Sequence, residues 1–147
     1  MLIDCGVFSQ SDVSGNVYKT QLKNLSKVNY YRLYIDCKNE EVYHQITEIL
    51  LIEPTIFDNE NTNEIKRLWC YAIDEKDEDD YVDYINIYLD LIEPKFPQLE
   101  RIGIERSDIS VWRIYEYQQQ CSMEITPQEM KRLGNNGITL CIDCFEK

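Results

Sequence analysis

Residues 109–145 read ISVWRIYEYQQQCSMEITPQEMKRLGNNGITLCIDCF, and this stretch decides the fold. Residues 109–117 alternate between two sets of side chains, as in a strand with two distinct faces. The tetrapeptide TPQE at 126–129 then supplies an N-cap threonine, a proline at the first helical position and a carboxylate three residues after the cap. Gly134 or Gly137 closes this short helix, and a second alternating strand follows. The stretch therefore predicts a strand, a capped helix and a strand.

The rest of the chain adds alternating strands and apolar-striped helices. In chain order, they are a strand at 29–37, a helix from Asn39 that Pro54 stops, a strand at 68–73, and a helix at 81–92 that Pro94 and Pro97 end. The strands lack the continuous apolar runs of a doubly covered parallel sheet. We expect an α+β two-layer sandwich, with a mostly antiparallel sheet of four to six strands. Two main helices and one short helix would cover one face.

The length of 147 residues fits a single domain with a real core. Residues 28–147 are expected to form its α+β core. Residues 1–27 form either an N-terminal hairpin or a loosely held arm. No run approaches the length of a membrane span, and the first residues lack the pattern of a signal peptide, so we expect a cytoplasmic protein.

The chain is strongly acidic, with 27 acidic and 15 basic residues and a net charge of −12. This balance argues against nucleic-acid binding, which needs basic side chains to neutralise phosphates. The negative charge favours attraction to a basic partner; the alternative is that it only keeps the protein soluble. The acids concentrate in one loop at Asp74, Glu75, Asp77, Glu78, Asp79 and Asp80. This run lacks the glycine and the spaced glutamate of an EF-hand calcium loop. It is either a solvated loop before a helix or a docking surface, and divalent-metal binding is the remaining alternative.

Tyrosine and arginine recur on two predicted strands. Tyr30, Arg32 and Tyr34 share one face of the first strand, opposite the apolar set Tyr31, Leu33, Ile35 and Cys37. Arg113, Tyr115 and Tyr117 share one face of the strand at 109–117. If these faces coincide, the sheet presents a Tyr/Arg surface of the kind enriched at protein interfaces. The alternative is ordinary cross-strand pairing or burial of the same tyrosines in the core.

No motif for catalysis, metal binding or a cofactor stands out, and we expect none of the three. His44 is the only histidine and has no catalytic partner nearby in sequence, which indicates a helix-surface position. Cys141 and Cys144 form a C-x-x-C, but residues three apart in a strand point to opposite faces. With no second cysteine pair to complete a zinc site, these two residues are expected to be thiols.

The run from residue 29 to residue 145 resembles the uncharacterised bacterial family catalogued as domain of unknown function 4279. Three places carry the resemblance: Ile52-Glu53-Pro54-Thr55 at a helix end, Leu68-Trp69 in a strand, and residues 123–143 with their capped helix and closing strand. The loop after Thr55 departs from the family pattern because it is rich in Asn and Glu and lacks glycine. The resemblance implies no known reaction. It implies that the protein acts as an immunity protein beside a bacterial toxin.

Together these features predict a non-enzymatic protein-binding module, specifically an immunity protein that inhibits a basic toxin by direct binding. The acidic run would steer association, and tyrosines would anchor the contact. Two alternatives stay open. One is an enzyme or small-ligand protein whose site is assembled from residues distant in sequence. The other is a self-associating structural module, and the oligomeric state is left undetermined.

Overall fold

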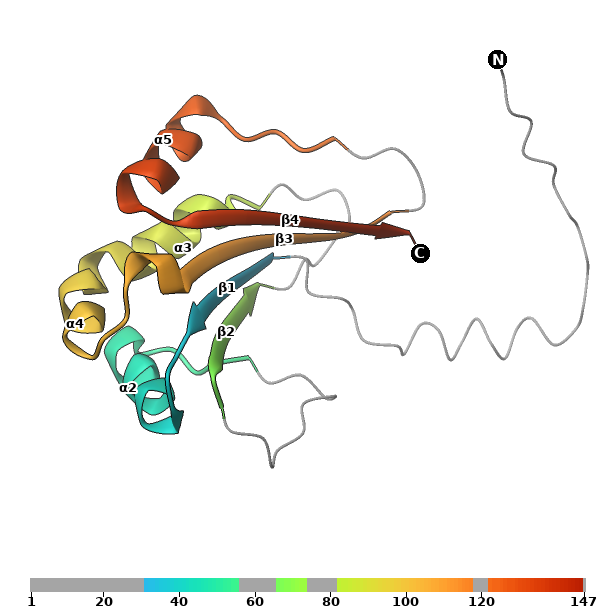
Figure 1. Ribbon diagram of the computed structural model, residues 1–147. Helices are drawn as coiled ribbons and strands as arrows, with labels where there is room; N and C mark the ends of the chain where they lie inside the picture. The colour runs from blue at the N-terminus through green and yellow to red at the C-terminus, as the bar shows by residue number, and fades with distance from the viewer. Residues whose placement is uncertain (1–30, 56–65, 74–81, 118–121, 147) are drawn as a thin grey trace, which may run out of the picture.

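The computed structural model describes residues 31–55, 66–73, 82–117 and 122–146, and the statements that follow concern these ranges. The predictions for residues 1–27 lie outside them. Four strands form one mixed sheet in the order β2-β1-β3-β4 (Figure 1). They are β1 (Tyr31–Asp36), β2 (Leu68–Ile73), β3 (Ile109–Tyr117) and β4 (Thr139–Glu146). β1 runs antiparallel to both of its neighbours, whereas β3 and β4 are parallel. The predicted α+β fold is confirmed.

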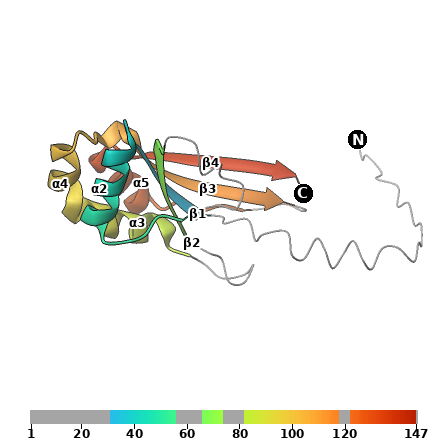
Figure 2. The same cartoon turned by 90° about the horizontal axis from the view of Figure 1, so that it is seen from below.

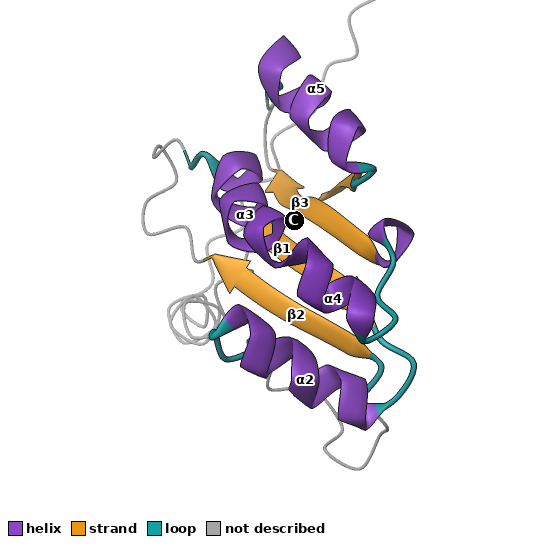
Figure 3. Ribbon diagram, turned by 90° about the vertical axis from the view of Figure 1, so that its left-hand side faces the viewer, coloured by secondary structure: helices purple, strands orange, loops and turns teal. Residues whose placement is uncertain are grey.

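The helices lie in front of the sheet when it is viewed face-on (Figure 3) and gather on one side of it when it is seen from below (Figure 2). They are α2 (Glu40–Leu50), α3 (Tyr84–Ile92), α4 (Phe96–Arg101) and α5 (Pro127–Asn136), with single 3-10 turns at Glu93–Lys95 and Arg106–Asp108. No helix in the described ranges is long and apolar enough to cross a membrane.

The face of the sheet toward the helices forms the hydrophobic core. Along β1, Tyr31, Leu33 and Ile35 are buried while Arg32 and Tyr34 are only half-buried, so the alternation predicted for this strand is confirmed. The core is completed by buried side chains from the other strands and the helices: Trp69, Ile109, Val111, Ile46, Leu50, Ile85, Tyr88, Leu89, Ile92, Phe96 and Leu99. Burying apolar area of this kind is the main favourable contribution to folding.

Side chains at the helix ends satisfy backbone groups as the sequence predicts. Asn39 caps α2, because its Oδ1 accepts a hydrogen bond from the N–H of Val42 at 2.9 Å. Thr126 and Glu129 form a reciprocal capping box at the start of α5. The Glu129 carboxylate is buried and accepts hydrogen bonds from the N–H and the hydroxyl of Thr126, at 2.6 and 2.7 Å. Gly137, with φ of 65°, closes α5.

The end predicted for the helix at 81–92 is confirmed, because α3 ends at Ile92. The chain then continues through the 3-10 turn into α4, a helix that was not predicted. Pro94 and Pro97 each occupy a first-turn position, where the missing N–H leaves no hydrogen bond unmade. The helix count is consequently larger than two long helices and one short one. α5 has 10 residues, close in length to α2 and α3, and α4 is an additional six-residue helix.

Leu51 ends α2 in the left-handed conformation, with φ of 57°. Replacing it with glycine is expected to raise the free energy of unfolding. For a residue with a Cβ this conformation costs about 1–2 kcal/mol, whereas glycine adds an entropic cost of about 0.5–1 kcal/mol. The side chain is 79% exposed, so little apolar burial is lost. The net gain should be about 0.5–1 kcal/mol in urea denaturation.

Leu51→Ala is the matched control for this substitution, because alanine keeps the Cβ while removing the exposed side chain. Its stability should stay close to that of the wild type. Equal stability of the glycine and alanine variants would show that the backbone at this position carries no strain.

Candidate protein-interaction surface

The pairing of β1 with β3 decides which faces carry the predicted Tyr/Arg residues. Tyr31 lies opposite Arg113, and Arg32 lies opposite Trp112. Directly opposed residues point to the same face of a sheet, so Arg113, Tyr115 and Tyr117 share the face that carries the helices. Arg32 and Tyr34 lie on the other face. The two predicted groups therefore do not coincide, and neither strand could reveal this alone because register is set by the whole sheet.

On the helix-bearing face, Arg113 is held between two tyrosines. Its guanidinium carbon lies 4.3 Å from the ring centroid of Tyr31 and 5.3 Å from that of Tyr115. The Tyr31 ring in turn lies 4.7 Å from the ring of Tyr84 on α3. We call Tyr84, Tyr31, Arg113 and Tyr115 the tyrosine–arginine stack. Cations are attracted to aromatic faces at such distances, so the two tyrosine rings help to orient the arginine.

The opposite face carries a second aromatic group, built around Trp112. Arg32 donates a hydrogen bond to the hydroxyl of Tyr34 at 2.8 Å, and the Tyr34 ring meets the Trp112 ring edge-on at 5.7 Å. The indole N–H of Trp112 donates to the hydroxyl of Ser110 at 2.8 Å. Burial raises the pKa of Tyr34, so its hydroxyl stays protonated at neutral pH. Trp112 was not among the predicted binding residues, although its position next to Arg113 in an alternating strand was a signal for it.

β3 and β4 continue past the end of β1 as a two-stranded ribbon. β1 begins at Tyr31, opposite Arg113, so residues 114–117 of β3 pair within the described ranges only with residues 143–146 of β4. Figure 1 shows both strands reaching beyond β1 and β2. Three large apolar side chains on or beside this ribbon are exposed: Ile142 at 47%, Phe145 at 38% and Tyr117 at 37%. The stack therefore leads from the core toward a ribbon with exposed side chains on β4 and at the end of β3.

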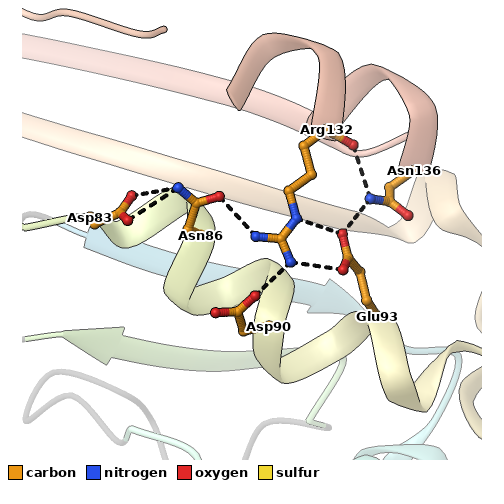
Figure 4. Close-up of polar contacts among 6 residues, drawn as sticks. All are labelled: Asp83, Asn86, Asp90, Glu93, Arg132 and Asn136. Atoms are coloured by element: carbon orange, nitrogen blue, oxygen red, sulfur yellow. Dashed lines mark hydrogen bonds and ion pairs between the residues drawn. The ribbon is translucent and has the colours of Figure 1, made fainter. Parts of the chain in front are cut away.

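A polar network joins α5 to α3 and to the turn that follows it (Figure 4). The Nε and Nη2 atoms of Arg132 donate to the two carboxylate oxygens of Glu93, at 2.8 and 2.7 Å. The guanidinium also donates to Asn86 at 2.8 Å and to Asp90 at 2.6 Å. Asn136 adds a bond of 2.7 Å to Glu93. Such bidentate pairing fixes geometry as well as charge, so the network positions α5 and the strand β4 that follows it.

Several predicted binding residues lie outside the described residues: Tyr30 and the acidic run of Asp74, Glu75, Asp77, Glu78, Asp79 and Asp80. Of the others, Arg32 and Tyr34 lie beside Trp112. Arg113 and Tyr115 belong to the stack, and Tyr117 lies at the exposed end of β3.

The histidine and cysteines do not assemble a reactive centre in the part of the chain that the structure describes. His44 is exposed on α2, with its Nε2 atom 3.8 Å from a carboxylate oxygen of Glu40. Cys141 and Cys144 lie in β4, where alternation turns them to opposite faces. Burial raises the pKa of the Cys37 and Cys141 thiols, which disfavours their reactive thiolate forms. No group of three or more His, Cys, Asp or Glu side chains in the described ranges could hold a metal ion.

Comparisons of the chain with protein-family models, curated proteins and solved structures found no match. The resemblance to domain of unknown function 4279 stays a prediction.

Substitution of Arg132 by methionine is expected to lower the free energy of unfolding by about 2 kcal/mol at pH 7, because hydrogen bonds to charged groups are lost. Hydrogen bonds from Arg132 hold the pKa of the Glu93 carboxyl below its usual value. The stabilisation from Glu93 should therefore be complete above its unfolded pKa of about 4.3 and disappear as the pH falls through the lower folded value. The stability difference between wild type and Glu93→Gln, followed by urea denaturation from pH 7 to pH 3, measures this loss.

Asp90→Asn is the matched control, since the Asp90 side chain is 72% exposed and its ion pair with Arg132 is screened by solvent. It should change stability much less than Arg132→Met. A loss in Asp90→Asn as large as that in Arg132→Met, or a Glu93→Gln difference that does not vary with pH, would contradict the central role of the Glu93 pair.

Proposed function

We propose that this protein is a cytoplasmic, non-enzymatic protein-binding module, and specifically a bacterial immunity protein that inhibits a basic toxin by direct binding. The observation that carries the proposal is the tyrosine–arginine stack, with Arg113 between Tyr31 and Tyr115, opening onto an exposed ribbon. Tyrosine and arginine are enriched among residues that dominate binding energy. A side chain already held in place loses less freedom on binding, which favours affinity.

The charge supports a basic partner. The whole chain carries −12, and the ribbon itself holds Glu116, Asp143 and Glu146. Complementary charge speeds the encounter of two proteins and disfavours partners of like charge. The toxin as partner is supported by the resemblance of residues 29–145 to the uncharacterised bacterial family. The cytoplasmic part of the proposal is supported by Cys37, which is a buried free thiol, the form that a reducing compartment maintains.

The direct test is co-purification with the product of the adjacent gene, followed by affinity measurement on the purified pair. Tyr117→Ala should weaken binding about tenfold, because truncating an interface anchor costs more than about 1 kcal/mol. His44→Ala is the matched control; it truncates an exposed ring on α2 and should leave affinity unchanged. Absence of a complex, or equal effects of both substitutions, would contradict the proposed contact.

The steering role of the acidic run is tested separately, by changing Asp77, Asp79 and Asp80 to lysine. Association should slow about tenfold at low salt, and the difference should shrink as salt screens the charges. A control with Glu41, Glu48 and Glu53 changed to lysine makes the same change in net charge on and beside α2. Equal slowing in both triple variants would mean that net charge, rather than this run, steers association. An unchanged rate at low salt would remove the electrostatic part of the proposal.

A further inference from the structure

The two edges of the sheet differ in how they end. At the β2 edge, Thr55 occupies backbone groups of the strand. Its N–H donates to the carbonyl of Cys70 at 2.8 Å, and its hydroxyl accepts from the N–H of Ala72 at 3.0 Å. At the other edge, β4 pairs with β3 on one side, and no strand in the described ranges pairs with its outer side. Within the described ranges, Thr55 therefore covers part of the β2 edge, whereas the outer side of β4 pairs with no strand.

In the described ranges, β4 lacks several features that protect an edge strand from pairing, although it carries the charged residues Asp143 and Glu146. Proteins prevent such pairing with short strands, bulges, prolines, charged side chains (lysine above all) or a covering helix or loop. β4 is eight residues long, its register with β3 is unbroken, and residues 139–146 contain neither proline nor lysine. Successive residues of a strand direct their N–H and C=O groups alternately to its two sides, so about half of these groups face away from β3. Residues 142–146 are all exposed.

We propose that the outer edge of β4 binds an extended segment of a basic protein, which joins the sheet as a fifth strand. This inference rests on the proposed function and names how the partner is bound. Main-chain hydrogen bonds would supply affinity, and alternate side chains would supply specificity, as in other cases of strand addition.

The side chains of β4 define the chemistry of the bound segment. On the helix-bearing face, Leu140, Ile142 and Cys144 offer an apolar row. On the opposite face, Asp143 lies beside Ile114 of β3, and Glu116 lies on the same face two residues further along β3. An added strand places each side chain beside an edge residue on the same face. The complementary segment consequently alternates apolar and basic residues. Its apolar residues lie on the helix-bearing face, and its lysines or arginines lie on the face of Asp143.

A second copy of this chain fits the edge less well. Two copies would each bring a net charge of −12, and each would bring Asp143 and Glu146 to the shared edge. Like charges across neighbouring strands are destabilising. The charge therefore favours a basic partner over self-association.

The test uses the full chain and a labelled peptide with the sequence Lys-Val-Lys-Val-Lys-Val-Lys, followed by fluorescence anisotropy at low salt. A matched peptide carries N-methyl groups on the central valine and on an adjacent lysine, which keeps the charge but removes one backbone donor on each side of the strand. The alternating peptide should bind saturably and the N-methylated peptide at least about tenfold more weakly, because an N-methylated amide cannot donate to a ladder. Equal binding of the two peptides would show non-specific charge attraction and overturn the inference.

Substitutions in the protein locate the site. Asp143→Lys should weaken peptide binding about fivefold, since an opposite-charge pair becomes a like-charge pair. Glu48→Lys makes the same charge change on α2 and should have no effect. Circular dichroism and urea denaturation verify that both variants fold. Equal weakening by both variants would overturn the β4 assignment.

Two further outcomes would overturn the proposed strand addition. One is that the alternating peptide does not bind. The other is that light scattering shows a dimer whose population changes in Asp143→Lys. Neither result touches the proposed function, which stands or falls on the complex with the adjacent gene product and its sensitivity to Tyr117→Ala. A complex that depends on Tyr117 and is indifferent to Asp143→Lys would retain the protein-binding role while removing the edge.

Discussion

The structure depends on the register between β1 and β3, in which Tyr31 lies opposite Arg113. This pairing aligns Leu33 with Val111 and Ile35 with Ile109, so the buried residues of both strands face the same helices. A slip of one residue would move every one of these side chains to the other face. The same register places Arg113 over the ring of Tyr31, which makes the core and the candidate binding surface parts of one alignment.

Arg132 extends that alignment to the last strand. α5 connects β3 to the parallel strand β4, and the Arg132–Glu93 pair holds α5 against the helical stretch that packs on the core. Parallel strands need such a crossover connection, so the position of β4 depends on where the helix is fastened. Contacts on the helix-bearing side thereby fix the position of β4. The outer backbone groups of this edge strand point away from the rest of the sheet. Thr55 has the opposite role at β2, where it occupies backbone groups of that edge.

Local signals predicted the elements well, whereas long-range relations could not be predicted. The alternation along residues 109–117 and the cap at Thr126 are properties of neighbouring residues, and both are confirmed. The helix α4 was not predicted, because proline is compatible with the first turn of a new helix as well as with the end of an old one. Two findings depend on residues far apart in the sequence: Arg32 and Arg113 lie on opposite faces of the sheet, and Arg132 pairs with Glu93. No local pattern in the sequence encodes either one.

The central claim is that a protein partner binds the ribbon formed by β3 and β4. Amide hydrogen exchange of the full chain, alone and with the product of the adjacent gene, tests it most directly, because hydrogen bonding and burial slow exchange. The account predicts slower exchange in the complex at residues 114–117 and 139–146, with α2 unchanged. Slower exchange confined to α2 and β2, with the ribbon amides unaffected, would contradict it.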